Sequence, residues 1–427
     1  MKTKLLIFGI TGDLATGRLL PALEQIISTG DFDELSVIGV SRHAVNQDEL
    51  FVNCGSKTFL DDKISILTMD LANLDDYKKL QLGMSLGLDE QLLIYMAVPP
   101  LATAQIVDLM GEAGINTPNV KILFEKPFGV DLESAEKLIK QTAKYYNEDQ
   151  IYRIDHYLAK EMTQNIVAVR GRNALFSQIW NNNFIESIDI IASELIGIEG
   201  RTHFYEQTGA MRDVVQGHLM QLLALTLMDI PNDFEWNKLP ELRLLALNQL
   251  QPVDPKKVIR AQYDGYKDEV GNPDSKTETF VSFEIVSNQS RWAGVPIKLM
   301  AGKALANRTT EIRIHLKKTN EAQSNCLVFR IQPDEGIDIE LFVKKPGYSR
   351  EFETRHLSFN YSADTKLPDA YEQVIVDAIS SQKSLFTNSL EVLRSWQILQ
   401  PIQDDWDTTS ELLKSYLKGS DILTLLG

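Results

Sequence analysis

The sequence contains little cysteine: Cys54 and Cys326 are the only two in 427 residues. Two such residues cannot build a disulfide framework, and their positions do not have the spacing of a metal site. The sequence therefore predicts neither feature. Low cysteine usage is typical of a reducing compartment, so we expect a cytoplasmic protein.

Long apolar runs are absent as well, because no stretch reaches the roughly 18 residues that a membrane-spanning helix needs. The N-terminus, MKTKLLIFGI, places two lysines before an apolar segment, as a signal peptide does. That segment is short, and Thr11, Gly12 and Asp13 follow it at once. It therefore predicts a buried strand, and no association with a membrane is expected.

Positive charge is in deficit: 43 Lys and Arg stand against 59 Asp and Glu, which gives a formal net charge of −16. This balance excludes nucleic-acid binding through bulk charge. A phosphorylated metabolite would need a local cluster of basic side chains instead. The length, with 44% hydrophobic residues, is sufficient for two domains with separate cores.

The first part of the chain alternates strand-like and helix-like segments. Apolar runs that predict strands lie at residues 4–10, 33–42, 63–70, 91–100 and 120–129. The segment after the first run has a helical period and ends at Gly30. This alternation predicts a Rossmann-like, doubly wound parallel sheet with right-handed crossovers over residues 1–155.

The first predicted strand-to-helix turn carries Gly9, Gly12 and Ala15. Small residues at this place let backbone amides approach a pyrophosphate at the helix N-terminus. The second predicted strand ends in Ser41 and Arg42 instead of an acid, and a guanidinium pairs well with a phosphate dianion. The pattern predicts a dinucleotide site and favours NADP, with NAD left open.

Residues 156–427 predict a larger α+β domain for substrate binding and oligomerisation. The later strand-like runs follow one another without helices between them, which favours a mainly antiparallel sheet flanked by helices. A loop is expected at 263–278, and helices at about 208–229 and 369–402. The predicted strands are 184–195, 277–287, 295–302, 310–318, 326–333 and 337–345.

Eight short motifs add a more specific signal. They are FGITGDLA (8–15), MAVPP (96–100), EKPFG (125–129), RIDHYLAKE (153–161), EGR…YEQTGAMRDVVQGHLMQ (199–221), VIRAQY (258–263), GKALANR (302–308) and RIQPDEG (330–336). In this order they resemble the glucose-6-phosphate 1-dehydrogenase family. The resemblance implies oxidation of glucose 6-phosphate to the 6-phosphoglucono-lactone with NADP, the entry step of the pentose phosphate route, by a homodimer or homotetramer.

The resemblance assigns proton transfer to His218 and Asp155. Oxidising the C1 hydroxyl of a sugar requires a base, and histidine suits this role near neutral pH. A carboxylate such as Asp155 would hold the imidazole tautomer and stabilise the imidazolium. Because this pair can move the proton, the predicted reaction requires no metal.

The resemblance assigns the sugar's phosphate to His156, Tyr157 and Lys160, whose side chains supply charge and hydrogen bonds. If the segment were helical, His156 and Lys160 would be four residues apart and share a face. Without the resemblance, the same stretch is a charged amphipathic turn.

The remaining predicted site residues are also those that the resemblance implies. Lys126, in EKPFG, would contact the substrate near the cofactor. The cofactor residues would be Gly9, Thr11, Gly12, Asp13, Leu14, Arg18, Arg42, Pro99 and Lys126. The other sugar contacts would be Glu194, Asp213, Lys303, Arg308 and Gln332.

The sequence departs from the family pattern in three ways. Arg18 stands where the family usually has lysine, Gly217 precedes His218 where asparagine is usual, and the chain is shorter after about residue 345. These departures keep open a catalytically weakened NADP-binding regulatory homologue. Another NAD(P)-dependent sugar dehydrogenase with an EKP turn is the second alternative, although GDLA and RIDHYLAKE are not expected of that group.

Overall fold

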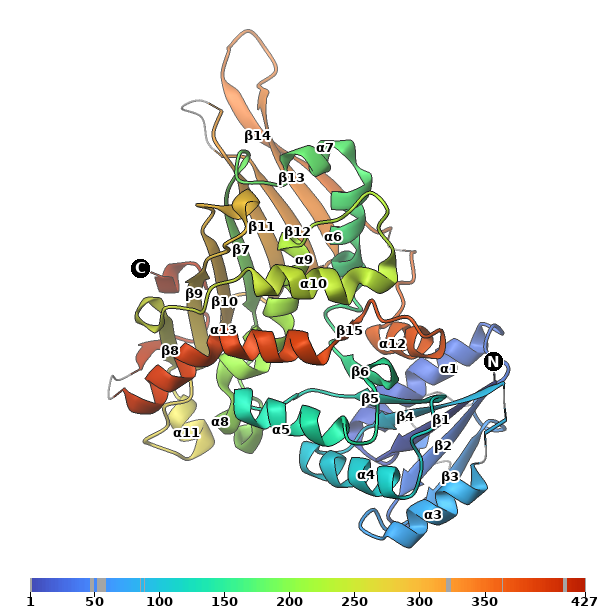
Figure 1. Ribbon diagram of the computed structural model, residues 1–427. Helices are drawn as coiled ribbons and strands as arrows, with labels where there is room; N and C mark the ends of the chain where they lie inside the picture. The colour runs from blue at the N-terminus through green and yellow to red at the C-terminus, as the bar shows by residue number, and fades with distance from the viewer. Residues whose placement is uncertain are drawn as a thin grey trace. The chain divides into compact units, whose positions relative to one another are not determined.

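The computed structural model divides the chain into two compact units (Figure 1). Unit 1 comprises Met1–Ala159, Glu235–Pro240 and Pro368–Val392, and unit 2 comprises Lys160–Phe234, Glu241–Leu367 and Leu393–Gly427. A single division after residue 155 therefore does not describe the chain, because Pro368–Val392, here called the returning segment, belongs to unit 1. The structure describes residues 2–46, 50–51, 59–84, 86–87, 89–319, 324–362, 364–409 and 413–426, and Cys54 lies outside them.

Unit 1 is built on a seven-stranded sheet with the order β15-β6-β5-β4-β1-β2-β3. All neighbours pair in parallel except β15, which is antiparallel to β6. This confirms the predicted Rossmann-like sheet. The strands are β1 (Lys2–Phe8), β2 (Leu35–Ser41), β3 (Ile64–Thr68), β4 (Glu90–Met96), β5 (Val120–Phe124), β6 (Ile151–Ile154) and β15 (Phe386–Thr387).

Helices cover both faces of this sheet, because successive side chains of a strand point to opposite sides. Leu5 and Ile7 join the core formed with α1 and α12, whereas the ring of Phe8 stacks on Tyr77 of α3 with centroids 6.2 Å apart. The helices of unit 1 are η1 (Ala15–Leu19), α1 (Leu20–Ser28), α3 (Leu74–Gly83), α4 (Pro100–Glu112), α5 (Leu132–Thr142), η2 (Glu148–Gln150), η4 (Trp236–Lys238) and α12 (Ala370–Ile379).

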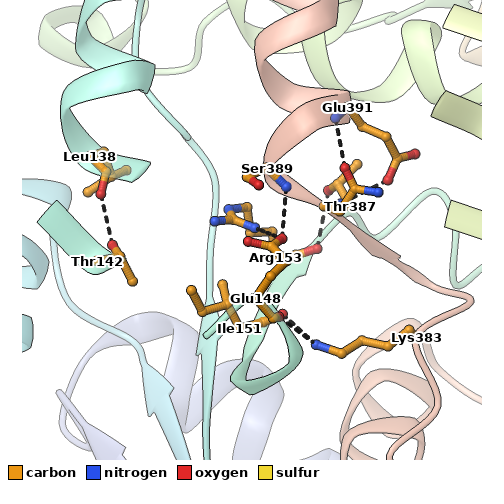
Figure 2. A network of polar contacts seen from close by, with 10 residues as sticks. Leu138, Thr142, Glu148, Ile151, Arg153, Lys383, Thr387, Ser389 and Glu391 are labelled. Carbon is orange, nitrogen blue, oxygen red and sulfur yellow. Dashed lines mark hydrogen bonds and ion pairs between the residues drawn. The ribbon is translucent and has the colours of Figure 1, made fainter. Parts of the chain in front are cut away.

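The returning segment is anchored to β6 by polar contacts, which Figure 2 shows. Glu148 accepts hydrogen bonds from the guanidinium of Arg153 at 2.6 Å and from the backbone N–H of Ser389 at 2.8 Å. The hydroxyl of Thr387 donates to the backbone oxygen of Arg153, and the ammonium of Lys383 donates to the backbone oxygens of Ile151, the first residue of β6, and of Glu148. These contacts attach the segment to the strand that leads into Asp155.

Unit 2 contains a nine-stranded sheet with the order β14-β13-β12-β11-β7-β10-β9-β8-β16. Its pairs are antiparallel except β10 with β7 and β16 with β8, which confirms a mainly antiparallel sheet. The strands are β7 (Ile185–Ser193), β8 (Ile259–Tyr263), β9 (Phe280–Ile285), β10 (Ile297–Gly302), β11 (Thr309–Leu316), β12 (Cys326–Gln332), β13 (Gly336–Lys344), β14 (Phe352–Asn360) and β16 (Lys414–Tyr416).

The helices of unit 2 flank this sheet. α9 is buried at every position, including its two polar residues, Gln221 and Thr226. The helices are α6 (Glu161–Arg172), α7 (Ala174–Ile179), α8 (Thr202–Ala210), η3 (Met211–Leu219), α9 (Met220–Leu227), α10 (Leu239–Asn248), η5 (Pro255–Lys257), α11 (Tyr266–Val270), η6 (Ser290–Trp292), α13 (Ser389–Thr408) and η7 (Thr424–Leu426), of which α10 and α13 begin in residues of unit 1. In the part of the chain that the structure describes, no helix combines the length and the apolar character needed to cross a membrane.

Two local predictions are wrong, and one conditional expectation is not met. The helix expected over 369–402 is interrupted by β15, and the loop expected over 263–278 contains the short α11. Residues 155–160 form turns instead of a helix, so His156 and Lys160 share no helical face. The reason is local: Oδ1 of Asp155 accepts the N–H of Tyr157 at 2.9 Å, a bond that competes with helix formation.

Candidate active site

The turn after β1 has the shape that a dinucleotide requires. Gly9 has φ +85°, and a Cβ there would lie 2.3 Å from the backbone oxygen of Ala97. Gly12 N–H donates to the Gly9 oxygen at 3.0 Å, which closes the turn in front of η1. The backbone can thus come close to a pyrophosphate at a helix N-terminus, as the sequence predicts. The side chains of Thr11 and Asp13 are exposed beside it.

Other predicted cofactor residues follow neighbouring strands of the same sheet. Arg42 directly follows β2 and is exposed, and no carboxylate stands at that strand end. Pro99 follows β4 and occupies the N-cap position of α4. Arg18 is exposed in η1, and Leu14 directly precedes that helix. Because β1, β2 and β4 are parallel neighbours, their carboxyl ends lie at one edge of the sheet, where ligands of such sheets bind.

Lys126 follows β5, and the residue before it forms contacts that the motif alone does not reveal. Oε1 of Glu125 accepts the hydroxyl hydrogen of Tyr95 at 2.5 Å, and Oε2 lies 3.1 Å from Nε2 of His156. Burial and the neighbouring Glu125 charge raise the pKa of the Tyr95 hydroxyl well above its usual range. The EKPFG motif therefore joins the ends of β4, β5 and β6.

Asp155 is buried at the end of β6, at 1% exposure, and its backbone oxygen accepts the N–H of Leu158. His156 and Tyr157 follow at half-buried positions. The ring of His156 packs on Tyr371 of α12, with centroids 4.2 Å apart. Unit 1 therefore gathers Asp155, His156 and Tyr157 at the same sheet edge as the turn after β1.

Unit 2 brings a second group of predicted residues together. Glu194 directly follows β7 and Lys303 directly follows β10, and these strands are parallel with Ser193 opposite Gly302. Oε2 of Glu194 lies 2.5 Å from the ammonium of Lys303, and Oδ2 of Asp213 lies 3.9 Å from it. Lys303 is only 2% exposed, and these carboxylates offset the cost of burying its ammonium.

Arg308 and Gln332 occupy the same end of the sheet. Arg308 is exposed just before β11, whose first residue pairs with Ser193. Gln332 ends β12 and donates its amide to the hydroxyl of Thr310 at 3.1 Å. The sheet thus places Glu194, Lys303, Arg308 and Gln332 together through strand register.

Lys160 is not part of this sheet. It is the N-cap residue of α6, has an extended backbone and is half-buried.

His218 lies in the last turn of η3, a π-helix whose first turn carries Asp213. A π-helix closes hydrogen bonds between residues five apart, so Asp213 and His218 project from closer faces than in an α-helix. Asp155 belongs to unit 1 and His218 to unit 2, and their catalytic pairing stays a prediction.

Glu278 is a further buried acid, which sequence reasoning missed. Its Oε1 accepts the N–H of Met211 at 2.8 Å, at the start of η3. Gly209 has φ +65°, and a Cβ there would lie 2.5 Å from the Glu278 carboxylate oxygens. Burial raises the pKa of Glu278 to about 7, and its hydrogen bond from Met211 and the charges of Arg212 and Arg260 oppose this rise.

The missed residues had little signal in the sequence. Glu125 was visible only as the first letter of EKPFG, and Tyr371 lies in a part of the chain with no recognised motif. Tyr205, whose ring lies 5.2 Å from the Lys303 ammonium, occupies an ordinary helical position. Chemically, the described side chains can bind anions and sugar hydroxyls and hold a proton-accepting imidazole.

Two family models match the chain: "Glucose-6-phosphate dehydrogenase, NAD binding domain" over residues 6–165 and "Glucose-6-phosphate dehydrogenase, C-terminal domain" over residues 167–422. The glucose-6-phosphate 1-dehydrogenase of Bacillus subtilis (strain 168) is 33% identical, with 98% of this chain and 94% of the relative covered. That of Chlamydia muridarum (strain MoPn / Nigg) is 32% identical, with 97% and 92% covered.

A solved structure of a glucose-6-phosphate dehydrogenase in complex with its substrate glucose-6-phosphate is also similar. It matches with a TM-score of 0.91 at 30% identity, over 100% of this chain and 97% of the other. The two family models together span nearly the whole sequence. The chain therefore belongs to the glucose-6-phosphate dehydrogenase family and is an oxidoreductase with a nicotinamide-binding Rossmann-like unit.

Proposed function

We propose that the protein oxidises glucose 6-phosphate at C1 to the 6-phosphoglucono-lactone with NADP as the acceptor, the entry step of the pentose phosphate route. The observation that carries this proposal is the group at the strand ends of unit 2, where the buried ammonium of Lys303 meets the carboxylates of Glu194 and Asp213. Carboxylates and an ammonium in one place suit the hydroxyls of a sugar. Family membership supports the same reaction.

His218 is the proposed base, which takes the proton of the C1 hydroxyl, and Asp155 is the proposed acid that orients the imidazole. Two structural features support these roles. The carboxylate of Asp155 is buried at a strand end, and η3 presents His218 on the helix that also carries Asp213. Glu194, Asp213, Arg308 and Gln332 would hold the sugar in a fixed orientation.

The residues of unit 1 fit a nicotinamide dinucleotide. A side chain at Gly9 would collide with Ala97, so this turn leaves space for a close approach of a pyrophosphate. The exposed guanidinium of Arg42 would bind a 2′-phosphate, which favours NADP over NAD. When bound, the dinucleotide accepts the hydride from C1, and Lys126 would help to orient the sugar beside it.

The phosphate of the substrate is assigned to His156, Tyr157 and Lys160. This assignment is supported by the position of His156 and Tyr157 at the carboxyl end of β6, next to Asp155. A hydroxyl, an imidazole and an ammonium together can bind a phosphate by charge-assisted hydrogen bonds. Replacing Lys160 by Ala is expected to raise the KM for glucose 6-phosphate and to affect unphosphorylated glucose little, whereas equal losses on both sugars would contradict this assignment.

The assay for this function follows NADPH formation at about 340 nm with glucose 6-phosphate, for the wild type and for His218→Ala. We expect turnover in the wild type and a loss of at least about a hundredfold in the variant, with unchanged circular dichroism. Binding of NADP without turnover by the wild type would instead support the regulatory homologue. Turnover of other sugar phosphates at higher kcat/KM would support a different sugar dehydrogenase.

Self-association is proposed as well, as a homodimer or homotetramer. Large apolar side chains are exposed on one face of β14, among them Leu357 at 59% and Phe359 at 47%, which are two residues apart and therefore point to the same side of the strand. Contiguous apolar surface of this kind favours burial in an interface. Sedimentation velocity of the wild type and of Leu357→Glu tests the proposal, and a monomeric wild type at micromolar concentration would contradict it.

A cytoplasmic location is also proposed. Cys326, a buried free thiol, supports this proposed setting.

A further inference from the structure

A chain of three side chains crosses the ends of adjacent parallel strands in unit 1. Tyr95, near the end of β4, donates its hydroxyl to Oε1 of Glu125, which follows β5. Oε2 of the same carboxylate lies 3.1 Å from Nε2 of His156, which follows β6 by two residues. The three strands are neighbours in the sheet, so their register brings these residues together although they are far apart in sequence.

The other side of His156 is also constrained. Its ring lies against Tyr371 of α12, with centroids 4.2 Å apart and planes inclined by 40°. Its Nδ1 is buried and has no hydrogen-bond partner among the described residues. Since a buried polar atom is normally paired, an unpaired ring nitrogen beside predicted ligand-binding residues indicates a partner from outside the chain.

We propose that Glu125 is a positioning residue for His156: it engages Nε2, and Nδ1 is thereby the nitrogen that serves the phosphate of the substrate. This inference rests on the proposed function, because it assumes that His156 binds that phosphate. Glu125 itself touches neither the substrate nor the cofactor in this role. Tyr95 holds the carboxylate from its other oxygen, and Tyr371 fixes the plane of the ring.

The chemistry of the imidazole explains why the carboxylate matters. A ring that carries protons on both nitrogens is a cation with two N–H donors. One donor then serves the Glu125 carboxylate and the other serves a phosphate oxygen, and both bonds are charge-assisted. Without the carboxylate, the ring could rotate or change tautomer, and Nδ1 would lose its fixed direction.

Tyr95 is suited to holding the Glu125 carboxylate because its hydroxyl stays protonated and can donate a hydrogen bond. Burial and the charge of Glu125 raise the pKa of its hydroxyl, so the proton remains on the oxygen at working pH. The same two causes raise the pKa of Tyr371, and the charge of Arg18 opposes this effect. Tyr371 comes from the returning segment, which therefore contributes to the surroundings of His156.

The kinetic test compares the wild type with Glu125→Gln and Tyr95→Phe in steady-state assays with glucose 6-phosphate. Loss of a charge-assisted hydrogen bond predicts a KM for glucose 6-phosphate that is about tenfold higher in Glu125→Gln and about threefold higher in Tyr95→Phe. The preference for glucose 6-phosphate over glucose should fall by the same factors. Glu136→Gln, which removes an exposed carboxylate of α5, serves as the charge-matched control. It should change neither the KM for glucose 6-phosphate nor the preference for glucose 6-phosphate over glucose.

Tyr95→Phe keeps the buried ring and removes only the hydroxyl, so it gives a result even if Glu125→Gln does not fold. A loss in both variants that is confined to kcat, with an unchanged KM for glucose 6-phosphate, would overturn the proposal. So would a KM that rises equally for glucose and glucose 6-phosphate, because the effect would then not involve the phosphate.

A second measurement does not depend on turnover. The ¹⁵N imidazole signals of His156, assigned by comparison with His156→Gln, should show Nε2 protonated and hydrogen-bonded in the ligand-free wild type and a changed pattern in Glu125→Gln. Identical His156 signals in the two proteins would overturn the positioning role. If the wild type fails to oxidise glucose 6-phosphate, the proposed function fails, while these signals still report whether Glu125 fixes the ring.

Discussion

Glu278 accepts the backbone N–H of Met211 at 2.8 Å and thereby satisfies one of the free donors at the start of η3. This contact matters because η3 carries both Asp213 and His218. The backbone oxygen of Glu278 also accepts the N–H of Ala210 at 3.0 Å. A buried acid that the sequence did not reveal thus fixes the beginning of the helix that presents the proposed base.

Replacing Glu278 by Gln should change how stability depends on pH. Burial raises the pKa of this acid from 4.5 to about 7, so between these values the folded state binds more protons than the unfolded state. Stability conferred by this group therefore falls as pH rises from 4.5 to 7, by on the order of 3 kcal/mol. Gln keeps an acceptor for Met211 and removes this titration.

The measurement for Glu278 is the free energy of unfolding by urea at several pH values between 4.5 and 8. We expect the difference in stability between Glu278→Gln and the wild type to grow in favour of the variant up to about pH 7 and then to level off. A difference that does not change with pH would show that Glu278 titrates alike in the folded and unfolded states.

Gly209→Ala should destabilise unit 2 more than an ordinary substitution of a glycine with positive φ. Gly209 has φ 65° and ψ −179°, a conformation nearly confined to glycine, so alanine there costs about 1–3 kcal/mol, and the added methyl would also lie 2.5 Å from the Glu278 carboxylate. Gly294→Ala is the matched control, because Gly294 has φ +77° and no atom within 4 Å of its added Cβ. Urea unfolding should show an extra loss of about 1–3 kcal/mol for Gly209→Ala, and equal losses would exclude the steric contribution.

Glu148→Ala should destabilise unit 1 through Arg153 and the returning segment. Glu148 and Glu136 have the same side-chain exposure, 41%, but the partner of Glu148 is Arg153 at 5% and that of Glu136 is Lys140 at 76%. Removing a partner from a buried cation is costly, although solvent screening at Glu148 reduces this to about 2 kcal/mol. Glu136→Ala should cost about 0.5 kcal/mol or less.

Thermal denaturation of the two variants checks this prediction. The midpoint should fall by several degrees for Glu148→Ala and stay within about one degree of the wild type for Glu136→Ala. The midpoint of Glu148→Gln, which retains an acceptor for the N–H of Ser389, should lie between the midpoints of the two alanine variants. Similar midpoints for both alanine variants would mean that the anchor of the returning segment contributes little.

Arg42→Ala should lower the preference for NADP over NAD. The guanidinium follows β2 and is exposed, and its proposed partner is the 2′-phosphate that only NADP carries. Loss of this charged contact should raise the KM for NADP about tenfold or more and leave that for NAD within about twofold. Initial rates with each cofactor measure the ratio, and a parallel change for both would remove Arg42 from the 2′-phosphate site.

Much of the fold was predictable, because its signals are local. The apolar strands of unit 1, the Gly9–Gly12 turn and the successive strands of unit 2 all depend on residues close in sequence. Whether residues 155–160 are helical was left open by the sequence, and the hydrogen bond from the N–H of Tyr157 to Asp155 favours a turn. The long helix expected over 369–402 failed because β15 pairs with β6, a contact made more than two hundred residues away.

By itself, the sequence determined the two kinds of sheet and the dinucleotide turn, because hydrophobic period and glycine spacing act over a few residues, and its resemblance to the family supplied the candidate side chains. Only the tertiary structure decided which of these side chains meet. Parallel register places Glu194 beside Lys303, and adjacent strand ends join Tyr95, Glu125 and His156. Such contacts depend on pairing between distant segments, which no local pattern encodes.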